Sequence, residues 1–123
     1  MFDVVKTTSI LHKGVKLDPS ILPAEKILSL ATNVGAETLN IPAGHLDKGY
    51  LADLILIRLD QIRLQPAVPE TVLVNLVHAA HGTDVDLVMV DGKIIVKDGH
   101  LTIMDELKIL ERMQKASELL LEV

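Results

Sequence analysis

The chain has 123 residues, of which 49% are hydrophobic and 24% charged, and its formal net charge is −5 at neutral pH. That length allows one modest domain, and the interspersed charges form no basic stripe for a nucleic-acid backbone or an anionic membrane. Phe2 and Tyr50 are the only aromatic residues and there is no cysteine, which argues against stacking surfaces for single-stranded nucleic acid and excludes disulfides and thiolate chemistry.

The N-terminus and the hydropathy pattern give no targeting or membrane signal. The first residues lack a basic region followed by a long apolar core. No uninterrupted apolar run approaches the roughly 18 residues of a spanning helix. We therefore expect a cytoplasmic protein without nucleic-acid or membrane partners.

Two helices are predicted in the first 40 residues. Apolar residues recur at helical intervals after Phe2, and Gly14 can adopt the left-handed conformation that ends a helix. Pro23 suits the first position of a second helix, because the N–H that it lacks has no partner there, and this helix is predicted to run to about Leu39. Its apolar face requires a partner surface and consists of Ile27, Leu30, Ala31, Val34 and Leu39.

Two stretches further along the chain are predicted to form strands. Residues 54–57 are a continuous apolar run, typical of a strand that is covered on both faces. Residues 85–90 form a second strand, and Asp91-Gly92 is the turn sequence of a hairpin whose return strand covers 93–97.

The segment between these strands contains a predicted loop and a predicted helix. Residues 65–70 include two prolines and are predicted to be a loop. Residues 71–80 are compatible with a strand or a helix, and a short helix fits them better.

Residues 102–123 are predicted to end the chain with an amphipathic helix. Thr102 and Asp105 resemble a capping box, with Asp in place of the usual Glu or Gln, and the helix is expected from Ile103 to about Leu121. Packing of its apolar stripe on the chain's own sheet is favoured over binding to a membrane or a partner. The stripe consists of Ile103, Leu107, Leu110, Met113 or Gln114, Ser117 and Leu120.

The histidines do not have the spacing of a metal site. They include no H-x-H pair. His78 and His81 have i, i+3 spacing, which on a helix would place two rings on one face, but no third ligand is evident. We therefore assign no residue to metal binding. The histidines are His12, His45, His78, His81 and His100.

The carboxylates are predicted to be structural. Asp91 and Asp98 occupy turns, where the side chain bonds nearby backbone N–H groups. Asp84 and Asp86 alternate at the start of a strand, and Asp53, at the edge of the apolar strand, is a candidate for a buried, hydrogen-bonded carboxylate. The chain also contains no G-x-S-x-G, G-x-x-x-x-G-K-[ST] or G-x-G-x-x-G sequence. The residues alone thus predict a small α+β domain without an active site.

Four segments, in order along the chain, resemble sequences of one enzyme superfamily. Residues 49–54, G-Y-L-A-D-L, are similar to a G-K-x-A-D-L strand, and 88–93, V-M-V-D-G-K, to a V-x-V-D-G-K hairpin. Residues 31–36 are similar to an A-T-x-x-G-A helix, and 75–85 to an N-L-V-[YH]-A-x-x-G-x-x-V stretch. The chain resembles the C-terminal portion of amidohydrolase-superfamily enzymes. The branch it resembles includes methylthioadenosine/S-adenosylhomocysteine deaminases and the N-ethylammeline and triazine chlorohydrolases.

The resemblance implies an α+β fold in which the chain is part of a larger enzyme. Residues 1–40 would be helices at the end of a metal-dependent TIM barrel, 41–101 would belong to a composite β-sandwich, and 102–123 would be the C-terminal helix. The strands 54–57 and 85–90 would pair with strands from the enzyme's N-terminal part. An isolated chain would expose strand edges and the apolar faces of its first two helices. We therefore expect a homo-oligomer, or association with the missing N-terminal barrel segment.

In such enzymes, the resemblance implies, zinc or another divalent metal activates a water that attacks a ring carbon and expels ammonia or chloride. The metal ligands, an H-x-H pair, two further histidines and an aspartate, would all lie before Met1. No catalytic, cofactor-binding or metal residue therefore carries over to this chain. The chain departs from the family pattern at three positions. His45 replaces a small residue, Tyr50 replaces the usual Lys, and His81 stands where Ser is common.

Two hypotheses follow. The first is that the chain is the C-terminal part of a metal-dependent hydrolase that acts on C–N or C–Cl bonds of aminopurine or triazine-like rings, and is inactive alone. The second is that it is a free-standing, non-catalytic association domain that completes a split hydrolase or an oligomer. The first is favoured, because a helix at the first residues would close a barrel in the complete enzyme and has no such neighbour here.

Overall fold

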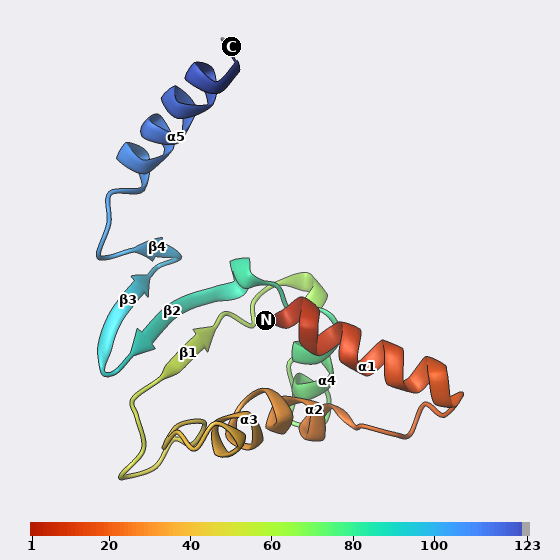
Figure 1. Ribbon diagram of the computed structural model, residues 1–123. Helices are drawn as coiled ribbons and strands as arrows, with labels where there is room; N and C mark the ends of the chain where they lie inside the picture. Colours follow the sequence, from red (N-terminus) through yellow and green to blue (C-terminus); the bar gives the residue numbers. More distant parts are fainter. Residues whose placement is uncertain (122–123) are drawn as a thin grey trace.

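Helices and strands occupy separate regions of the molecule (Figure 1). The computed structural model describes residues 1–121. Helices α1–α4 cluster at one end, a four-stranded antiparallel sheet lies beside them, and α5 projects beyond the edge strand β4. The elements are α1 (Phe2–Lys16), α2 (Ala24–Ala31), α3 (Asn33–Thr38), β1 (Leu54–Ile57), the 3₁₀ turn η1 (Ile62–Leu64), α4 (Val72–His78), the 3₁₀ turn η2 (Gly82–Asp84), β2 (Val85–Val90), β3 (Lys93–Lys97), β4 (His100–Leu101) and α5 (Glu106–Leu121).

Helix α1 continues past Gly14, where the sequence predicts its end. A single glycine costs a helix only about 1 kcal/mol, and this helix is fixed by its buried residues Val5 and Ser9. Leu17 instead adopts the left-handed conformation, with φ 52°, and its N–H donates to the Gly14 carbonyl at 3.3 Å. The predicted helix is correct and its predicted end is wrong.

The helix predicted from Pro23 to Leu39 is two helices, α2 and α3, separated at Thr32. Thr32 has φ −123° and ψ −101°, outside the helical region. Its hydroxyl donates to the Leu28 carbonyl at 2.8 Å, one turn back. The prediction of one continuous helix is therefore wrong, although both pieces lie within the predicted range.

The segment around Gly44 folds back onto the break between α2 and α3. Gly44 lies directly against it, because a Cβ at Gly44 would be 2.6 Å from Asn33 N and 2.7 Å from the Thr32 carbonyl carbon. Gly44 also has φ 80°, which favours glycine. The break between α2 and α3 is therefore packed by a segment that follows both helices.

The sheet has the order β1-β2-β3-β4, with every neighbouring pair antiparallel. Ile55 is opposite Val88, and Val88 is opposite Val96. Asp91 and Gly92 both have positive φ, 48° and 72°, as a two-residue hairpin turn requires. The predicted strands at 54–57, 85–90 and 93–97 and the hairpin between the last two are confirmed.

The segment before β1 holds this hairpin turn. The Asp53 carboxylate accepts a hydrogen bond from the Asp91 N–H at 2.7 Å, and the Ala52 carbonyl accepts one from the Gly92 N–H at 3.1 Å. Asp53 is exposed rather than buried, so the expected burial is wrong, whereas the expected hydrogen-bond partner is present. Two of the sequence motifs therefore meet in space.

The predicted short helix at 71–80 is confirmed as α4, and the predicted proline-containing loop precedes it. Asn75 of α4 donates from Nδ2 to the carbonyls of Leu64 and Pro66, at 3.0 and 3.1 Å. These bonds fix the loop to the first turns of the helix, so this asparagine has a structural role.

Helix α5 begins three residues later than expected. Thr102 does not cap it, because its hydroxyl donates to the Ile94 carbonyl at 2.7 Å. The cap is Asp105, whose carboxylate accepts from the Lys108 N–H at 3.1 Å. None of residues 106–121 is buried, so the prediction that this helix packs on the chain's own sheet is wrong. The last two residues of the predicted range 102–123 lie outside the described residues.

The buried core of residues 1–121 is small and lies among α1, α2 and α4, with Leu64 of η1 and Ala80 beside them. Strand β1 is not covered on both faces, since Ile55 and Leu56 remain 43% and 53% exposed. No helix in this part of the chain is long and apolar enough to cross a bilayer. Its buried hydrophobic residues are Val5, Ile27, Leu64, Val77 and Ala80.

Replacing Gly44 with alanine is expected to lower the free energy of unfolding more than the same change at Gly49. Both glycines have positive φ, 80° and 92°, so both variants share a conformational cost of the order of 1–2 kcal/mol. Only Gly44 adds a backbone clash, because a Cβ at Gly49 has nothing within 4 Å. Urea denaturation followed by circular dichroism measures both variants. Equal losses would contradict the close packing at the helix break.

Candidate functional site

The two histidines considered as a metal pair do not share a helix. Helix α4 ends at His78, and His81 is extended, with φ −126° and ψ 165°. Partial burial lowers the pKa of His78, and the ammonium groups of Lys13 and Lys6 lower it further, so the ring is neutral at pH 7. Among residues 1–121, no group of three or more histidine, cysteine or acidic side chains could hold a metal ion.

Asp84 is the buried centre of a charged cluster whose other members are partly exposed. Its side chain is 2% exposed, forms an ion pair with Arg63, and accepts from the His81 N–H at 2.8 Å. Burial by itself raises the pKa of Asp84, but the His81 N–H and the Arg63 guanidinium outweigh it, so the pKa lies below its usual value. Arg58 extends the cluster, with its Nε 3.6 Å from Asp86.

This cluster connects parts of the chain rather than forming a reaction centre. Asp84 is an ionised acceptor whose partners are both donors, so no general base and nucleophile face each other there. The sequence correctly predicts structural roles for Asp84 and Asp86. It does not reveal their partners, because Arg63 lies 21 residues before Asp84 and bonds to it only in the folded chain.

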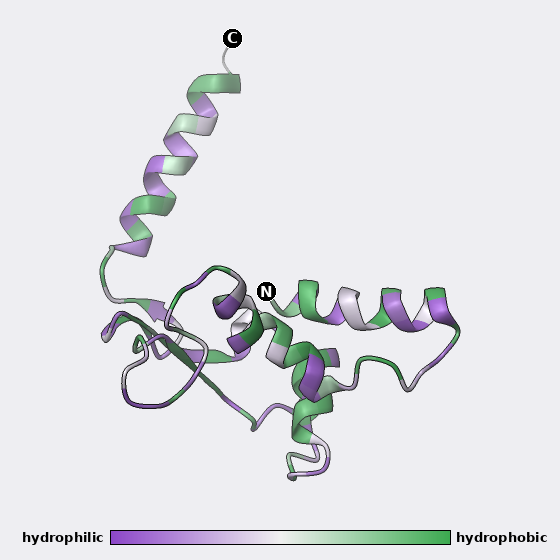
Figure 2. Cartoon of the chain, turned by 60° about the horizontal axis from the view of Figure 1, so that its bottom comes forward, coloured by the Kyte–Doolittle hydropathy of each residue, from purple (hydrophilic) through white to green (hydrophobic). Residues whose placement is uncertain are grey.

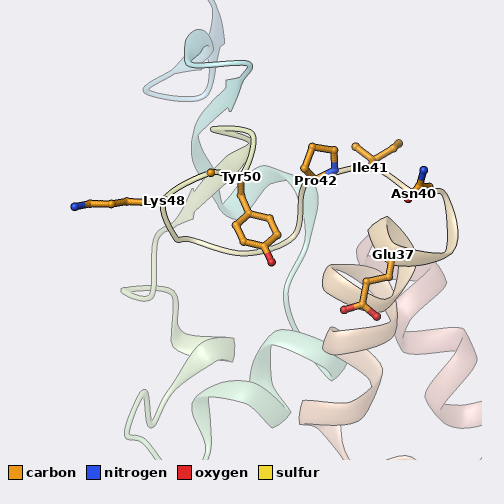
Figure 3. Close-up of a pocket in the computed structure, with 7 residues that line it drawn as sticks. Glu37, Asn40, Ile41, Pro42, Lys48 and Tyr50 are labelled. Carbon is orange, nitrogen blue, oxygen red and sulfur yellow. The ribbon is translucent and has the colours of Figure 1, made fainter.

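An open hollow of about 550 Å³ lies between α3 and the loop that precedes β1 (Figure 3). The ring of Tyr50 and the side chain of Glu37 border it, whereas Lys48 extends away from it. The Tyr50 ring packs on His45, with centroids 4.7 Å apart and planes at 50°. Two residues that depart from the family pattern thus contact each other. The hollow is open and its polar groups form no acid–base pair among the described residues.

The outer side of α1 presents exposed apolar side chains. Val4, Leu11 and Val15 recur at helical intervals and are 68%, 59% and 72% exposed, on a helix whose inner side buries Val5 and Ser9. One groove of about 310 Å³ follows this outer side, and another of about 150 Å³ lies between α1 and α2. We call this surface the α1–α2 face. It consists of Val4, Thr8, Leu11, Val15 and Leu30.

Comparison with known proteins identifies the chain's family. Residues 1–95 match the model of the amidohydrolase family. The chain belongs to this family. It is 42% identical over 120 residues to a 5'-deoxyadenosine deaminase of Methanocaldococcus jannaschii, a match that covers 98% of this chain and 28% of the relative. The chain thus spans little more than a quarter of that relative's length.

Two solved enzyme structures contain the same arrangement of helices and strands. An adenosine deaminase from Xanthomonas campestris with bound zinc has a TM-score of 0.87 and 30% identity, over 100% of this chain and 28% of its own. Atrazine chlorohydrolase from Arthrobacter aurescens has a TM-score of 0.78 at 23% identity, over 94% of this chain and 26% of its own, which shows the common fold. The predicted α+β segment of an amidohydrolase, with deaminase and chlorohydrolase relatives, is confirmed. The boundaries proposed at residues 40 and 101 stay a prediction.

The pH dependence of stability is expected to report the buried Asp84. Its folded-state pKa is lowered, so its charge stabilises the fold above the unfolded-state pKa of about 3.9. This contribution is lost as the pH falls through the lower folded-state pKa. Asp84→Asn should cost about 1–3 kcal/mol at pH 7, and its difference from the unmodified chain should shrink below about pH 4.

Asp86→Asn is the matched control for this measurement. Its carboxylate is 35% exposed and 3.6 Å from Arg58, so the loss should stay below about 1 kcal/mol. Urea denaturation at a series of pH values measures both variants. An Asp84→Asn loss that does not change between pH 7 and pH 3 would contradict the ionised, paired state of Asp84.

Proposed function

We propose that this chain is the C-terminal part of a metal-dependent amidohydrolase that removes an amino group from an aminopurine ring, and that it is inactive alone. The observation that carries the proposal is the 42% identity to a 5'-deoxyadenosine deaminase, which extends over 98% of this chain but only 28% of that enzyme. Hydrolysis of a C–Cl bond of a triazine-like ring is less supported, because the likeness to the chlorohydrolase is one of fold at 23% identity.

The metal would be held by a part of the enzyme other than residues 1–121. Those residues contain no group of three or more ligands that could bind it. Zinc or another divalent ion in the complete enzyme would supply an activated water. The described residues offer no group that fits a step of that chemistry, so their contribution is structural.

Packing of the α1–α2 face on the barrel is the contribution that the geometry supports. Covering an exposed Val or Leu side chain is worth roughly 1.5–3 kcal/mol, and Val4, Leu11 and Val15 are each more than half exposed. Strand β1 is an edge strand: among the described residues, β2 pairs with one edge of it and no strand pairs with the other. Its free edge would accept a strand from the N-terminal part of the enzyme.

A split enzyme is the second candidate. The α1–α2 face is formed by side chains alone. A barrel on a separate polypeptide could therefore cover this face in the same way as a barrel on the same chain. An antibody against this segment distinguishes the two candidates in the source cells. A native product several times heavier than 13.4 kDa indicates one polypeptide, and a product of 13.4 kDa indicates two.

A chimeric enzyme tests the proposal directly. The 120 residues that match this chain in the Methanocaldococcus jannaschii deaminase are replaced by the corresponding residues of this chain. Release of ammonia from 5'-deoxyadenosine is expected from the chimera, and none from the 123-residue chain alone. Turnover by the isolated chain would contradict the proposal, as would a folded chimera without activity.

Two neighbouring apolar residues of α1 provide a matched pair for the same assay. Leu11 lines a groove of the α1–α2 face and is 59% exposed, whereas Ile10 lines neither groove and is 56% exposed. Leu11→Asp should reduce the yield of folded, active chimera at least about tenfold, the equivalent of 1.4 kcal/mol, and Ile10→Asp should leave it unchanged. Equal effects would show that the α1–α2 face is not the docking surface.

A further inference from the structure

We propose that the Glu106 side chain is a latch that fixes the direction of α5 relative to the sheet, and that α5 turns about residues 103–105 when the latch opens. The α5 latch consists of Glu106, the first residue of α5, and of His100 and Leu101, which form β4. All three residues belong to this chain, so the latch does not depend on the proposed function.

Apolar packing does not fix the direction of α5. None of residues 106–121 is buried. The helix extends beyond β4 and away from the cluster of α1–α4 in both views (Figures 1 and 2), and hydrophobic and hydrophilic residues alternate along it in Figure 2. A helix without a packed side needs another restraint to keep one direction, because a short connection allows many backbone conformations.

The chain is fixed to the sheet as far as Thr102. The Thr102 N–H donates to the Ile95 carbonyl at 3.0 Å, and the Thr102 hydroxyl donates to the Ile94 carbonyl at 2.7 Å. Residues 103–105 then belong to no helix or strand, and all three are exposed. We call these three residues the pivot, because they are the point at which α5 can turn.

The Glu106 carboxylate spans the pivot. One of its oxygens accepts from the Leu101 N–H at 2.9 Å, and the other lies 3.1 Å from His100 Nδ1. Two bonds from separate oxygens restrain orientation more than one bond does. Among residues 1–121, no other side chain of α5 is hydrogen-bonded to another helix or strand. The α5 latch is therefore the restraint that closes the pivot.

The charge of Glu106 suits this role. The Leu101 N–H, and after it the His100 ring, hold the pKa of Glu106 below its usual value, so the side chain is ionised at pH 7. An ionised carboxylate accepts hydrogen bonds at both oxygens, as this arrangement requires. The bond also gives the Leu101 N–H an acceptor in β4, which is an edge strand of the sheet.

A small turn at the pivot has a large effect on the far end of α5. With 16 residues and a rise of about 1.5 Å per residue, the helix is about 24 Å long. A turn of about 30° would therefore move its far end by about 12 Å. A helix held in one direction also loses less conformational entropy when another surface covers it. The α5 latch thus orients the helix in advance of any such contact.

Amide hydrogen exchange of the 123-residue chain, measured by NMR, tests whether the α5 latch is formed. Glu106→Ala should speed exchange of the Leu101 N–H roughly three- to tenfold, as expected for the loss of a hydrogen bond to a partly exposed charged group. The Thr102 N–H, whose acceptor is the Ile95 carbonyl, is the internal control and should keep its rate. Equal Leu101 rates in the variant and the unmodified chain would overturn the proposal.

Distances between two spin labels test whether the latch sets the direction of α5. The chain has no native cysteine, so labels are attached at Lys93→Cys on β3 and Ser117→Cys on α5, two exposed positions. Pulsed electron spin resonance measures their separation, with an excess of unlabelled chain to exclude distances between chains. The unmodified chain should give one narrow distribution. Glu106→Ala should give one at least about twice as broad, because the helix amplifies turns at the pivot.

Glu111→Ala is the matched control for the distance measurement. It removes the same charge from the same helix and leaves the α5 latch intact. The narrow distribution should therefore persist in Glu111→Ala. A narrow distribution in Glu106→Ala, or a broad one in the unmodified chain, would overturn the proposal.

A further variant separates opening of the latch from loss of the helix. Glu106 is also the acidic residue in the first turn of α5, where a negative charge stabilises the helix dipole. His100→Ala removes one arm of the latch and keeps this charge, so it should broaden the distance distribution without changing the circular dichroism spectrum. A weaker helix signal in Glu106→Ala, together with an unchanged distribution in His100→Ala, would assign Glu106 to helix stability alone and overturn the proposal.

Discussion

The scarcity of buried apolar side chains is the constraint on which the rest of this structure depends. Five hydrophobic residues are buried in residues 1–121, although nearly half of the whole chain is hydrophobic. Their burial offsets only part of the conformational entropy lost when a chain of this length is ordered. The exposed α1–α2 face is therefore a surface whose burial by a partner would stabilise the fold. This arrangement supports the proposal that the chain is one part of a larger enzyme.

Polar contacts between distant segments hold this sparse structure in place. Asp53 fixes the hairpin turn at Asp91, and Asn75 fixes the loop before α4. The Arg63–Asp84 pair connects η1 with η2, immediately before β2. Such contacts give directional restraint where apolar packing is thin, because each satisfies a donor and an acceptor at a defined distance.

The segments that resemble amidohydrolase sequences supply these contacts rather than chemistry. A-D-L and V-D-G-K meet through Asp53 and the hairpin, and the N-L-V stretch provides Asn75. Their order along the chain therefore identifies a fold, whereas the proposed activity would depend on a site built by another part of the enzyme. This explains how a chain can belong to a hydrolase family while its described residues bring no catalytic group together.

The sequence by itself determined the elements whose cause is local. The positive φ of Asp91-Gly92, the apolar runs at 54–57 and 85–90 and the helical periodicity after Phe2 each act within a few residues, so hairpin, strands and helix were predictable. The family followed in the same way, from short motifs in order. For the site, the sequence correctly indicated a structural role for Asp84, but not that Arg63 is its partner.

Only the tertiary structure decided features that depend on distant residues. The helix break at Thr32 is packed by Gly44, and Thr102 is drawn away from the cap of α5 by the Ile94 carbonyl. The outward position of α5 depends on Glu106 binding β4. The physical reason is the same in each case: a backbone group or carboxylate bonds to whichever partner the folded chain brings near, and local spacing does not specify that partner.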